Sequence, residues 1–409
     1  MDRITSIIIG GGLRSGPLSP FIGRYIALVR EQGYKPASIR CQLLVIAALN
    51  RWLERTRRRA EDIDALNIDR FLHQRLRQKR THQGERSILH RLCSLLPMGK
   101  RSVGQTLSSE RNAWIVEPYR QYLLKERGLA VHTAYAYTRW VDQFLLSRFR
   151  RRPTRLRVLN GRDLTVFVQR SAPRCSRARA IHLVAALRSF SRFLRYSGRT
   201  DANLEIGVPS VAHWAMADVP KYLSAEEVEK VLAGCNRDTA LGRRDYAILL
   251  LLARLGLRGG EVLGLTLEDI DWDSGTITIP VTKNRRGARL PLPNDAGKAI
   301  AEYLRRDRPR CPCRRVFLRV NAPYAGLSSS PVISMVVAKA LRRAGVQSAR
   351  TGAHVFRHSF ATALLRRGAS LQEIGQLLRH NNPKTTAIYA KVDVEALRGI
   401  ALRWPGGAK

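Results

Sequence analysis

Residues 354–380 read HVFRHSFATALLRRGASLQEIGQLLRH and residues 385–392 read TTAIYAKV, and these stretches decide the fold. His354 and Arg357 are three residues apart on a helical pattern, so both project from one face of a predicted helix. Histidine and guanidinium groups bind phosphate oxygens, and Tyr389, which follows them, is a candidate nucleophile. An isolated H-x-x-R pair is weak evidence, so the rest of the chain has to support this interpretation.

The tyrosine needs help from its surroundings to react. A phenol with a pKa near 10 is a poor nucleophile by itself, whereas neighbouring cations favour its phenolate form. His380 comes just after the predicted helix 370–379 and could donate a hydrogen bond to the same phosphate. Tyr389 is therefore expected close to positive charge.

A second guanidinium comes from the segment Gly256-Leu-Arg258-Gly-Gly-Glu261. A glycine in a helix interior costs about 1 kcal/mol relative to alanine, so glycines beside an arginine indicate that the backbone approaches something closely. Arg258 could fork onto a phosphate with Glu261 bracing it three residues on. The alternative is a surface ion pair within one helix. Two guanidinium groups together could bind the non-bridging oxygens of a phosphodiester and favour its pentacoordinate state.

A basic hairpin is predicted between strands at 276–280 and 288–292. Lys283 stands at its tip, where an ammonium could reach a departing oxygen in a DNA groove. The alternative is a solvated turn that adds only non-specific affinity for phosphate. Three arginines lie behind the tip: Arg285, Arg286 and Arg289.

The order of these elements resembles the tyrosine recombinase (phage integrase) family, and 354–391 resembles a Xer-type catalytic domain. An arginine, a hairpin lysine, H-x-x-R, a histidine and a tyrosine follow one another as in that family, and the resemblance covers about residues 115–395. It implies a mainly α protein with a small β-sheet, in which helical N-terminal DNA-binding domains and a mixed α/β catalytic domain form a C-shaped DNA clamp.

The resemblance also implies roles for the site residues. Tyr389 would attack the scissile phosphate, form a 3′-phosphotyrosyl link and free a 5′-hydroxyl. Arg258 and Arg357 would hold the non-bridging oxygens. The bond energy is kept in the phosphotyrosine, so the resemblance implies neither a metal nor a nucleotide cofactor.

Three further residues would handle protons and hydrogen bonds. By the same resemblance, Lys283 would protonate the leaving 5′-oxygen, His354 would manage the tyrosine proton, and His380 would hydrogen-bond the transition state. One position departs from the family, which commonly has glycine before the second histidine, whereas Arg379 stands here. The added cation could tighten DNA binding or change the turn.

The composition favours a nucleic-acid partner. The 409 residues include 72 Lys+Arg and 32 Asp+Glu, and a net charge of +40 is tolerated mainly when a polyanion neutralises it. An anionic membrane is the second candidate, but apolar runs such as 247–253 fall far short of the roughly 20 residues that span a bilayer. We therefore expect a cytoplasmic protein. Of six cysteines only Cys311 and Cys313 are close-spaced, which predicts reduced thiols rather than a metal site.

The chain divides into three expected domains: an extra N-terminal helical module at 1–110, a core-binding SAM-like helical domain at 111–210, and a catalytic domain at 220–409. The first module resembles the second at an offset of 95 or 96 residues, either as a duplicate or by chance. In the core-binding domain three arginines are expected to meet DNA backbone phosphates and to give salt-sensitive affinity rather than specificity: Arg174, Arg177 and Arg179.

The expected function is site-specific recombination or integration of a mobile element. The partner would be double-stranded DNA with inverted-repeat sites, bound by a homo- or hetero-tetramer, with no membrane involved. A terminal helix at 392–404 would dock on a neighbouring subunit or pack in cis. The alternatives are a type IB topoisomerase, which shares the arginine, lysine and tyrosine chemistry, and a non-catalytic DNA-binding accessory protein.

Overall fold

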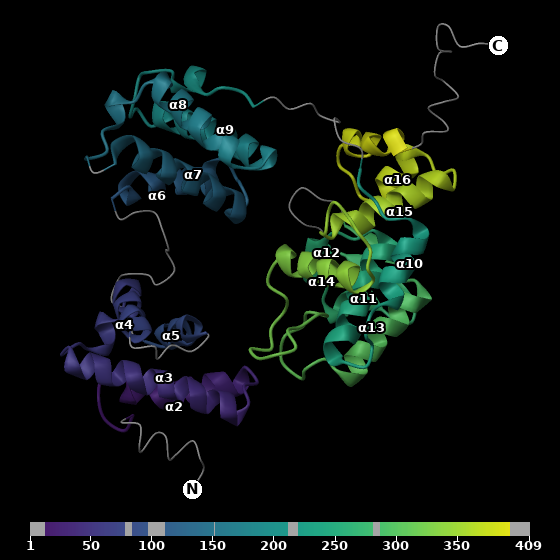
Figure 1. The fold of residues 1–409 in the computed structure, drawn as a ribbon, viewed down its shortest axis with the longest axis horizontal. Coiled ribbons are helices and arrows are strands. Elements are labelled where there is room, and N and C mark those ends of the chain that lie inside the picture. The colour runs from purple at the N-terminus through teal and green to yellow at the C-terminus, as the bar shows by residue number, and fades with distance from the viewer. Residues whose placement is uncertain are drawn as a thin grey trace. The chain divides into compact units, whose positions relative to one another are not determined.

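The computed structural model is helical with one small sheet, which confirms the predicted fold class (Figure 1). It describes residues 13–77, 84–96, 111–150, 152–211, 220–280 and 287–392. Two compact units are distinguished, of which one holds residues 61–73 and 97–215 and the other holds the remaining residues. Among the described helices none is long and apolar enough to cross a bilayer.

The N-terminal residues form four helices, which are α2 (Ser19–Glu31), α3 (Pro36–Arg55), α4 (Ala65–Arg77) and α5 (Glu85–Cys93). The apolar residues that recur at helical spacing in α3 are buried, among them Leu43, Ile46 and Leu53. The Tyr25 hydroxyl donates to Gln42 Oε1 at 2.6 Å, which satisfies both groups inside this packing.

The second bundle consists of α6 (Ala113–Gln121), α7 (Val131–Phe149), α8 (Gly161–Ser171) and α9 (Arg177–Tyr196). Helices α7 and α9 lie side by side (Figure 1). The core of the second bundle contains many aromatic residues, and the rings of Tyr119 and Phe190 pack edge to face at a centroid distance of 5.2 Å. A capping box between Asn160 and Asp163 fixes the start of α8.

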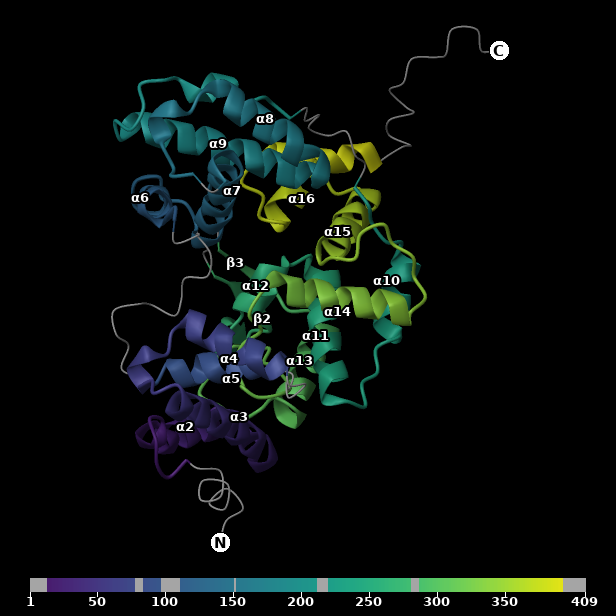
Figure 2. The same ribbon diagram turned by 60° about the vertical axis from the view of Figure 1, so that its left-hand side comes forward.

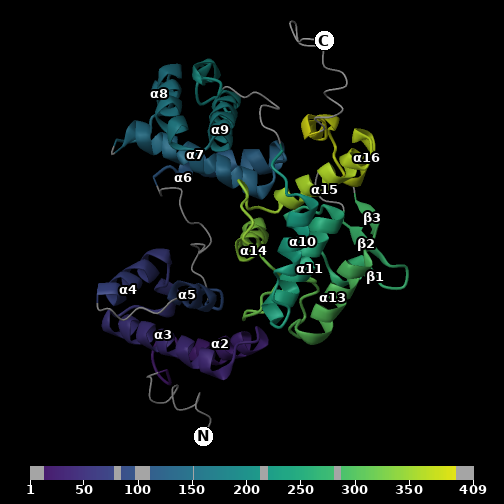
Figure 3. The same cartoon turned by 45° about the vertical axis from the view of Figure 1, so that its right-hand side comes forward.

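The remaining described residues form seven helices and the sheet. The helices are α10 (Ala225–Ala233), α11 (Ala240–Leu255), α12 (Gly259–Gly264), α13 (Asn294–Arg306), α14 (Ser330–Arg343), α15 (His354–Arg366) and α16 (Leu371–Leu377). The antiparallel strands are β1 (Ile270–Asp271), β2 (Thr276–Ile279) and β3 (Ala288–Pro291), in that order (Figure 3). The apolar α11 is buried and packs on α13 and α15, while α14 runs past α10 and α12 (Figure 2).

The predicted strands 276–280 and 288–292 are β2 and β3, each one residue shorter than expected. A capping box starts α10, with Ser224 Oγ accepting from the Glu227 amide at 3.1 Å. The apolar helix α11 begins at Ala240, because Thr239 caps it by accepting from the Gly242 amide. The hairpin tip with Lys283, Arg285 and Arg286 lies outside the described residues, as does the predicted terminal helix from residue 393 onward.

Candidate active site

The turn between α11 and α12 brings Arg258 to the site. Gly256 ends α11 with a φ of +57°, and a Cβ there would lie 2.7 Å from Phe360 Cδ1, so both the backbone and the space require glycine. Arg258 then caps α12: its amide donates to Glu261 Oε2 at 2.8 Å, and its Nη1 donates to Oε1 at 2.9 Å. The expected bracing by Glu261 is present, but the surface location is wrong, because the carboxylate is only 4% exposed.

Arg357, on α15, reaches two backbone turns. Its Nη1 donates to the Gly256 carbonyl at 2.6 Å, and its Nη2 donates to the Leu378 carbonyl just after α16. Burial of the side chain and the charge of Arg258 lower the pKa of Arg357 to about 9. A guanidinium is therefore held in the interior at the point where α11 and α16 both end.

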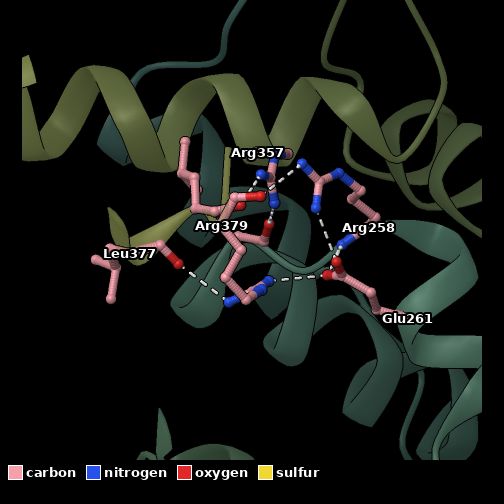
Figure 4. Close-up of polar contacts among 7 residues, drawn as sticks. Arg258, Glu261, Arg357, Leu377 and Arg379 are labelled. Atoms are coloured by element: carbon pink, nitrogen blue, oxygen red, sulfur yellow. Dashed lines mark hydrogen bonds and ion pairs between the residues drawn. The ribbon is translucent and has the colours of Figure 1, made fainter. Parts of the chain in front are cut away.

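The two predicted phosphate-binding arginines converge on one turn. Arg258 Nη2 donates to the Arg379 carbonyl at 3.4 Å, and Arg357 binds the carbonyl of the preceding residue, Leu378 (Figure 4). They come from positions 99 residues apart in the chain, as the difference between 357 and 258 gives. Two guanidinium groups at one place are the arrangement that stabilises a doubly charged phosphorane.

Tyr389 lies in the same cluster, with its side chain 1% exposed. Its hydroxyl is 3.0 Å from His358 Nδ1, and the two rings meet edge to face. Burial raises the pKa of Tyr389 although the charges of Arg357 and Arg258 act to lower it. The cations expected near Tyr389 are thus present and favour the phenolate, but desolvation of the phenolate outweighs them in this state.

His358 is a site residue that the sequence interpretation missed. It stands next to Arg357 and four residues after His354, so it shares a helix face with that histidine, and this spacing was the available signal. The ring centroids of His354 and His358 are 6.4 Å apart. Burial, followed by the charges of His354, Arg350 and Arg357, lowers the pKa of His358 to about 4. A neutral imidazole has one acceptor nitrogen, so Nδ1 can receive the phenol proton.

The two histidines of the predicted site differ in their surroundings. His354 is exposed at the start of α15, whereas Arg357 one turn later is buried. His380 is half-buried, with its Nδ1 2.7 Å from Thr386 Oγ1, three residues before the tyrosine. Burial and the charges of Arg357 and Arg258 lower the pKa of His380 to about 4. His380 is thus neutral at pH 7 and tied to the segment that carries Tyr389.

Arg379 points inward. Its φ is +55°, the left-handed region that costs a non-glycine residue about 1–2 kcal/mol. Its Nη2 donates to Glu261 Oε2 at 2.8 Å and its Nη1 donates to the Leu377 carbonyl at 3.0 Å (Figure 4). Neither of the two expectations for this residue fits: a buried guanidinium does not face DNA, and the backbone of Arg379 keeps the left-handed conformation that glycine would adopt.

The remaining predicted DNA contacts are scattered over exposed surfaces. Arg289 on β3 is exposed and its Nη2 donates to Asp271 Oδ2 at 2.7 Å. Arg174 lines one basic cleft of the second bundle, whereas Arg179 lines another and lies over the Trp140 ring at 5.7 Å. Arg177 is exposed at the start of α9. Within the second bundle, Arg174 and Arg179 thus line two different clefts.

Comparison with known families agrees with this arrangement. Residues 221–396 match the Phage integrase family, and residues 116–198 match the Phage integrase N-terminal SAM-like domain. The chain is 39% identical to "Putative integrase/recombinase y4rA" of Sinorhizobium fredii over 96% of both chains. It is 30% identical to tyrosine recombinase XerD of Listeria monocytogenes over 70% of this chain and 96% of that protein.

Solved structures share the fold at lower identity. The post-cleavage complex of the XerH site-specific recombinase with its palindromic difH substrate gives a TM-score of 0.56 at 20% identity, covering 71% of this chain and 84% of that chain. A lambda integrase dimer bound to a core site gives 0.53 at 15% identity, covering 72% and 97%.

Proposed function

This chain belongs to the phage integrase family and is a tyrosine-type site-specific DNA recombinase, and on that premise we propose that Tyr389 is its nucleophile, with Arg258 and Arg357 as the phosphate clamp. Enzymes of this kind cleave and rejoin DNA strands through a 3′-phosphotyrosyl intermediate. The observation that carries the assignment is the convergence of both guanidinium groups on the turn at residues 378–379, within electrostatic range of the Tyr389 phenol.

The proposed reaction is a transesterification at phosphorus. The Tyr389 oxygen bonds to the phosphorus, the bond to the 5′ oxygen breaks, and Lys283 gives that oxygen its proton. Arg258 and Arg357 neutralise the non-bridging oxygens, which carry most charge in the pentacoordinate state. A 5′-hydroxyl from a partner strand reverses these steps and completes the exchange.

The phenol proton needs an acceptor, and the site offers two imidazoles. His358 lies within hydrogen-bond distance of the hydroxyl in the free protein, which supports it as the group that holds Tyr389 and receives the proton. His354 stays the proton manager expected from the family resemblance, one ring further out. His380 would hydrogen-bond the phosphate once DNA displaces the contact to Thr386.

The free protein has to rearrange before it can react. A side chain that is 1% exposed cannot reach a phosphorus atom on a DNA duplex. We propose that DNA binding moves the segment around residues 387–392 and uncovers the phenol, as conformational steps do in many enzymes. This keeps the nucleophile from attacking DNA outside an assembled complex.

We propose the domain architecture and the partners by analogy with the family. The proposed domains are an N-terminal module at 1–110, a core-binding domain at 111–210 and the catalytic domain at 220–409. The proposed partner is double-stranded DNA with inverted-repeat sites, held as a tetramer on paired sites with basic side chains on the backbone. Relaxation of supercoiled DNA of arbitrary sequence would instead indicate type IB topoisomerase activity.

A nicked suicide substrate tests the nucleophile. The site is taken from inverted repeats bordering the gene, and wild type should become covalently attached to a 3′ end. Tyr389→Phe should bind this DNA without attachment. Tyr303→Phe is the matched control, since Tyr303 is also about 1% exposed and its hydroxyl only accepts from the Leu318 amide. An adduct formed by Tyr389→Phe would refute the assignment.

A further inference from the structure

The turn after α16 is a helix cap with an unusual residue in it. The His380 amide donates to the Gly375 carbonyl and the Arg379 amide donates to the Gln376 carbonyl, both at 2.9 Å, which is the Schellman pattern. Such a cap needs a left-handed residue at the position of Arg379, and glycine is the usual choice. The turn alone therefore does not explain why an arginine occupies position 379.

The backbone of this cap holds both arginines of the phosphate clamp. After the last helical hydrogen bond, the carbonyls of Leu378 and Arg379 are left without partners in the helix. Arg357 donates to the first and Arg258 donates to the second, at 3.4 Å. The position of the cap thus sets the position of both guanidinium groups.

The side chain of Arg379 acts on the same clamp from its other side. Its Nη2 donates to Glu261 Oε2 at 2.8 Å, while the other oxygen of this carboxylate accepts from Arg258 at 2.9 Å (Figure 4). Arg379 and Glu261 are both 4% exposed, so water does not screen the pair. Among the described side chains, Arg379 Nε is a buried donor without a partner, so this placement has a cost.

The buried position of Arg379 changes the charge balance between Glu261 and Arg258. Without Arg379, the buried Glu261 carboxylate would face Arg258 alone in this chain of contacts and cancel most of its charge. With Arg379 present, one carboxylate is shared by two guanidinium groups, and net positive charge is left at Arg258 for a phosphate. A buried carboxylate between two cations also has a single favoured geometry, which fixes the Arg258 side chain.

We infer that Arg379 is a positioning residue for DNA cleavage: it neutralises and orients Glu261 so that Arg258 keeps its charge and its aim toward the scissile phosphate. The inference rests on the proposed function and adds a third guanidinium to the site, one that never touches the DNA. It also gives a functional reason for an arginine at position 379, where the family commonly has glycine.

The experiment compares Arg379→Gly and Arg379→Lys with wild type on the suicide substrate. Glycine suits the left-handed cap, so the turn is kept and the side chain alone is removed. We expect adduct formation about 100-fold slower for Arg379→Gly, since a displacement of about 1 Å in a clamp has an effect of that size. DNA affinity should stay close to wild type, whereas Tm should fall because Glu261 loses a buried partner. Arg379→Lys, which keeps the charge, should recover much of the rate.

A second substrate separates positioning from a general structural defect. It carries a methylphosphonate at the scissile position, so that one non-bridging oxygen is replaced by a neutral methyl group and the clamp has less charge to neutralise. On this substrate Arg379→Gly should form the adduct only a few-fold more slowly than wild type. The rate difference between Arg258→Ala and wild type should decrease in the same way. Arg243→Met is the matched control, because it removes another largely buried ion pair, with Asp307 at 2.7 Å, at the opposite end of α11 from Gly256.

Two results would overturn the inference. One is a wild-type cleavage rate for Arg379→Gly on the phosphodiester. The other is a cleavage rate of Arg379→Gly that is reduced equally on both substrates, together with a Tm lowered as much as in Arg243→Met. That result would mean that Arg379 only stabilises the fold. In both cases wild type would still form the adduct and Tyr389→Phe would not, so the proposed function is judged separately.

Discussion

Acid should destabilise the catalytic domain through two neutral histidines at its centre. His358 and His380 each have a pKa of about 4 instead of the usual 6.5, because burial and nearby cations oppose their protonation. Below pH 6.5 the unfolded chain binds a proton at each ring, whereas the folded chain does not until about pH 4. The free energy of unfolding is therefore fully retained above pH 6.5 and falls as the pH drops through this window.

The magnitude follows from the two pKa values. A lowering from 6.5 to about 4 corresponds to about 3.4 kcal/mol for a fully buried group at 1.36 kcal/mol per pH unit. Both rings are only half-buried, so solvent screening reduces the contribution to about 2 kcal/mol each. For a domain of this size, 1 kcal/mol shifts Tm by about 2–4 °C, which predicts a loss of about 4–8 °C per histidine at pH 4.5.

Calorimetry between pH 7.5 and 4.5 measures this effect. His358→Gln removes the titrating ring, so its Tm should fall less than that of wild type as the pH is lowered, whatever their difference at pH 7.5. His132→Gln is the control, because that histidine is exposed on α7 in the second bundle. The discriminating quantity is the change of the Tm difference with pH.

A parallel fall of Tm in wild type and in His358→Gln would refute the reasoning. It would mean that the ring is protonated in the folded protein at the same pH as in the unfolded chain. Burial and the neighbouring cations would then not oppose protonation of His358, and the loss of stability in acid would have to come from other groups.

Further predictions concern the clamp, the leaving group and DNA affinity. Gly256→Ala should lower stability by at least about 1 kcal/mol in calorimetry and slow cleavage, because its φ is +57°, its Cβ would meet Phe360 at 2.7 Å and its carbonyl holds Arg357. Lys283→Met should slow cleavage of normal DNA but not of a substrate with sulfur at the 5′ bridging position, since a thiolate leaves without a proton; equal slowing on both would remove Lys283 from this role. Arg179→Ala should reduce the slope of log affinity against log salt by about one and leave the rate of the bound complex unchanged, as filter binding and single-turnover cleavage can show.

Local sequence signals were sufficient for most of the secondary structure. The strands β2 and β3 were predicted to within one residue, and the helix that precedes His380 was predicted as well. Helix caps, apolar spacing and alternation act between residues a few positions apart, so the sequence states them directly. The order of the arginines, lysine, histidines and tyrosine was equally readable, and it indicated the family to which the chain belongs.

The state of each site residue was decided by tertiary structure. The sequence interpretation placed cations beside Tyr389 and expected them to favour the phenolate, but the phenol is buried on His358, 31 residues away in the chain. It expected Arg379 to tighten DNA binding or to change the turn, but the side chain points inward to a carboxylate 118 residues away in the chain.

The amino-acid sequence by itself thus determined which chemical groups are present, on which elements, and to which family they point. Only the folded chain decided which of these groups meet, which are shielded from water and which cation is neutralised. The physical reason is that desolvation and ion pairing depend on distances between residues remote in sequence, and a linear pattern does not contain those distances.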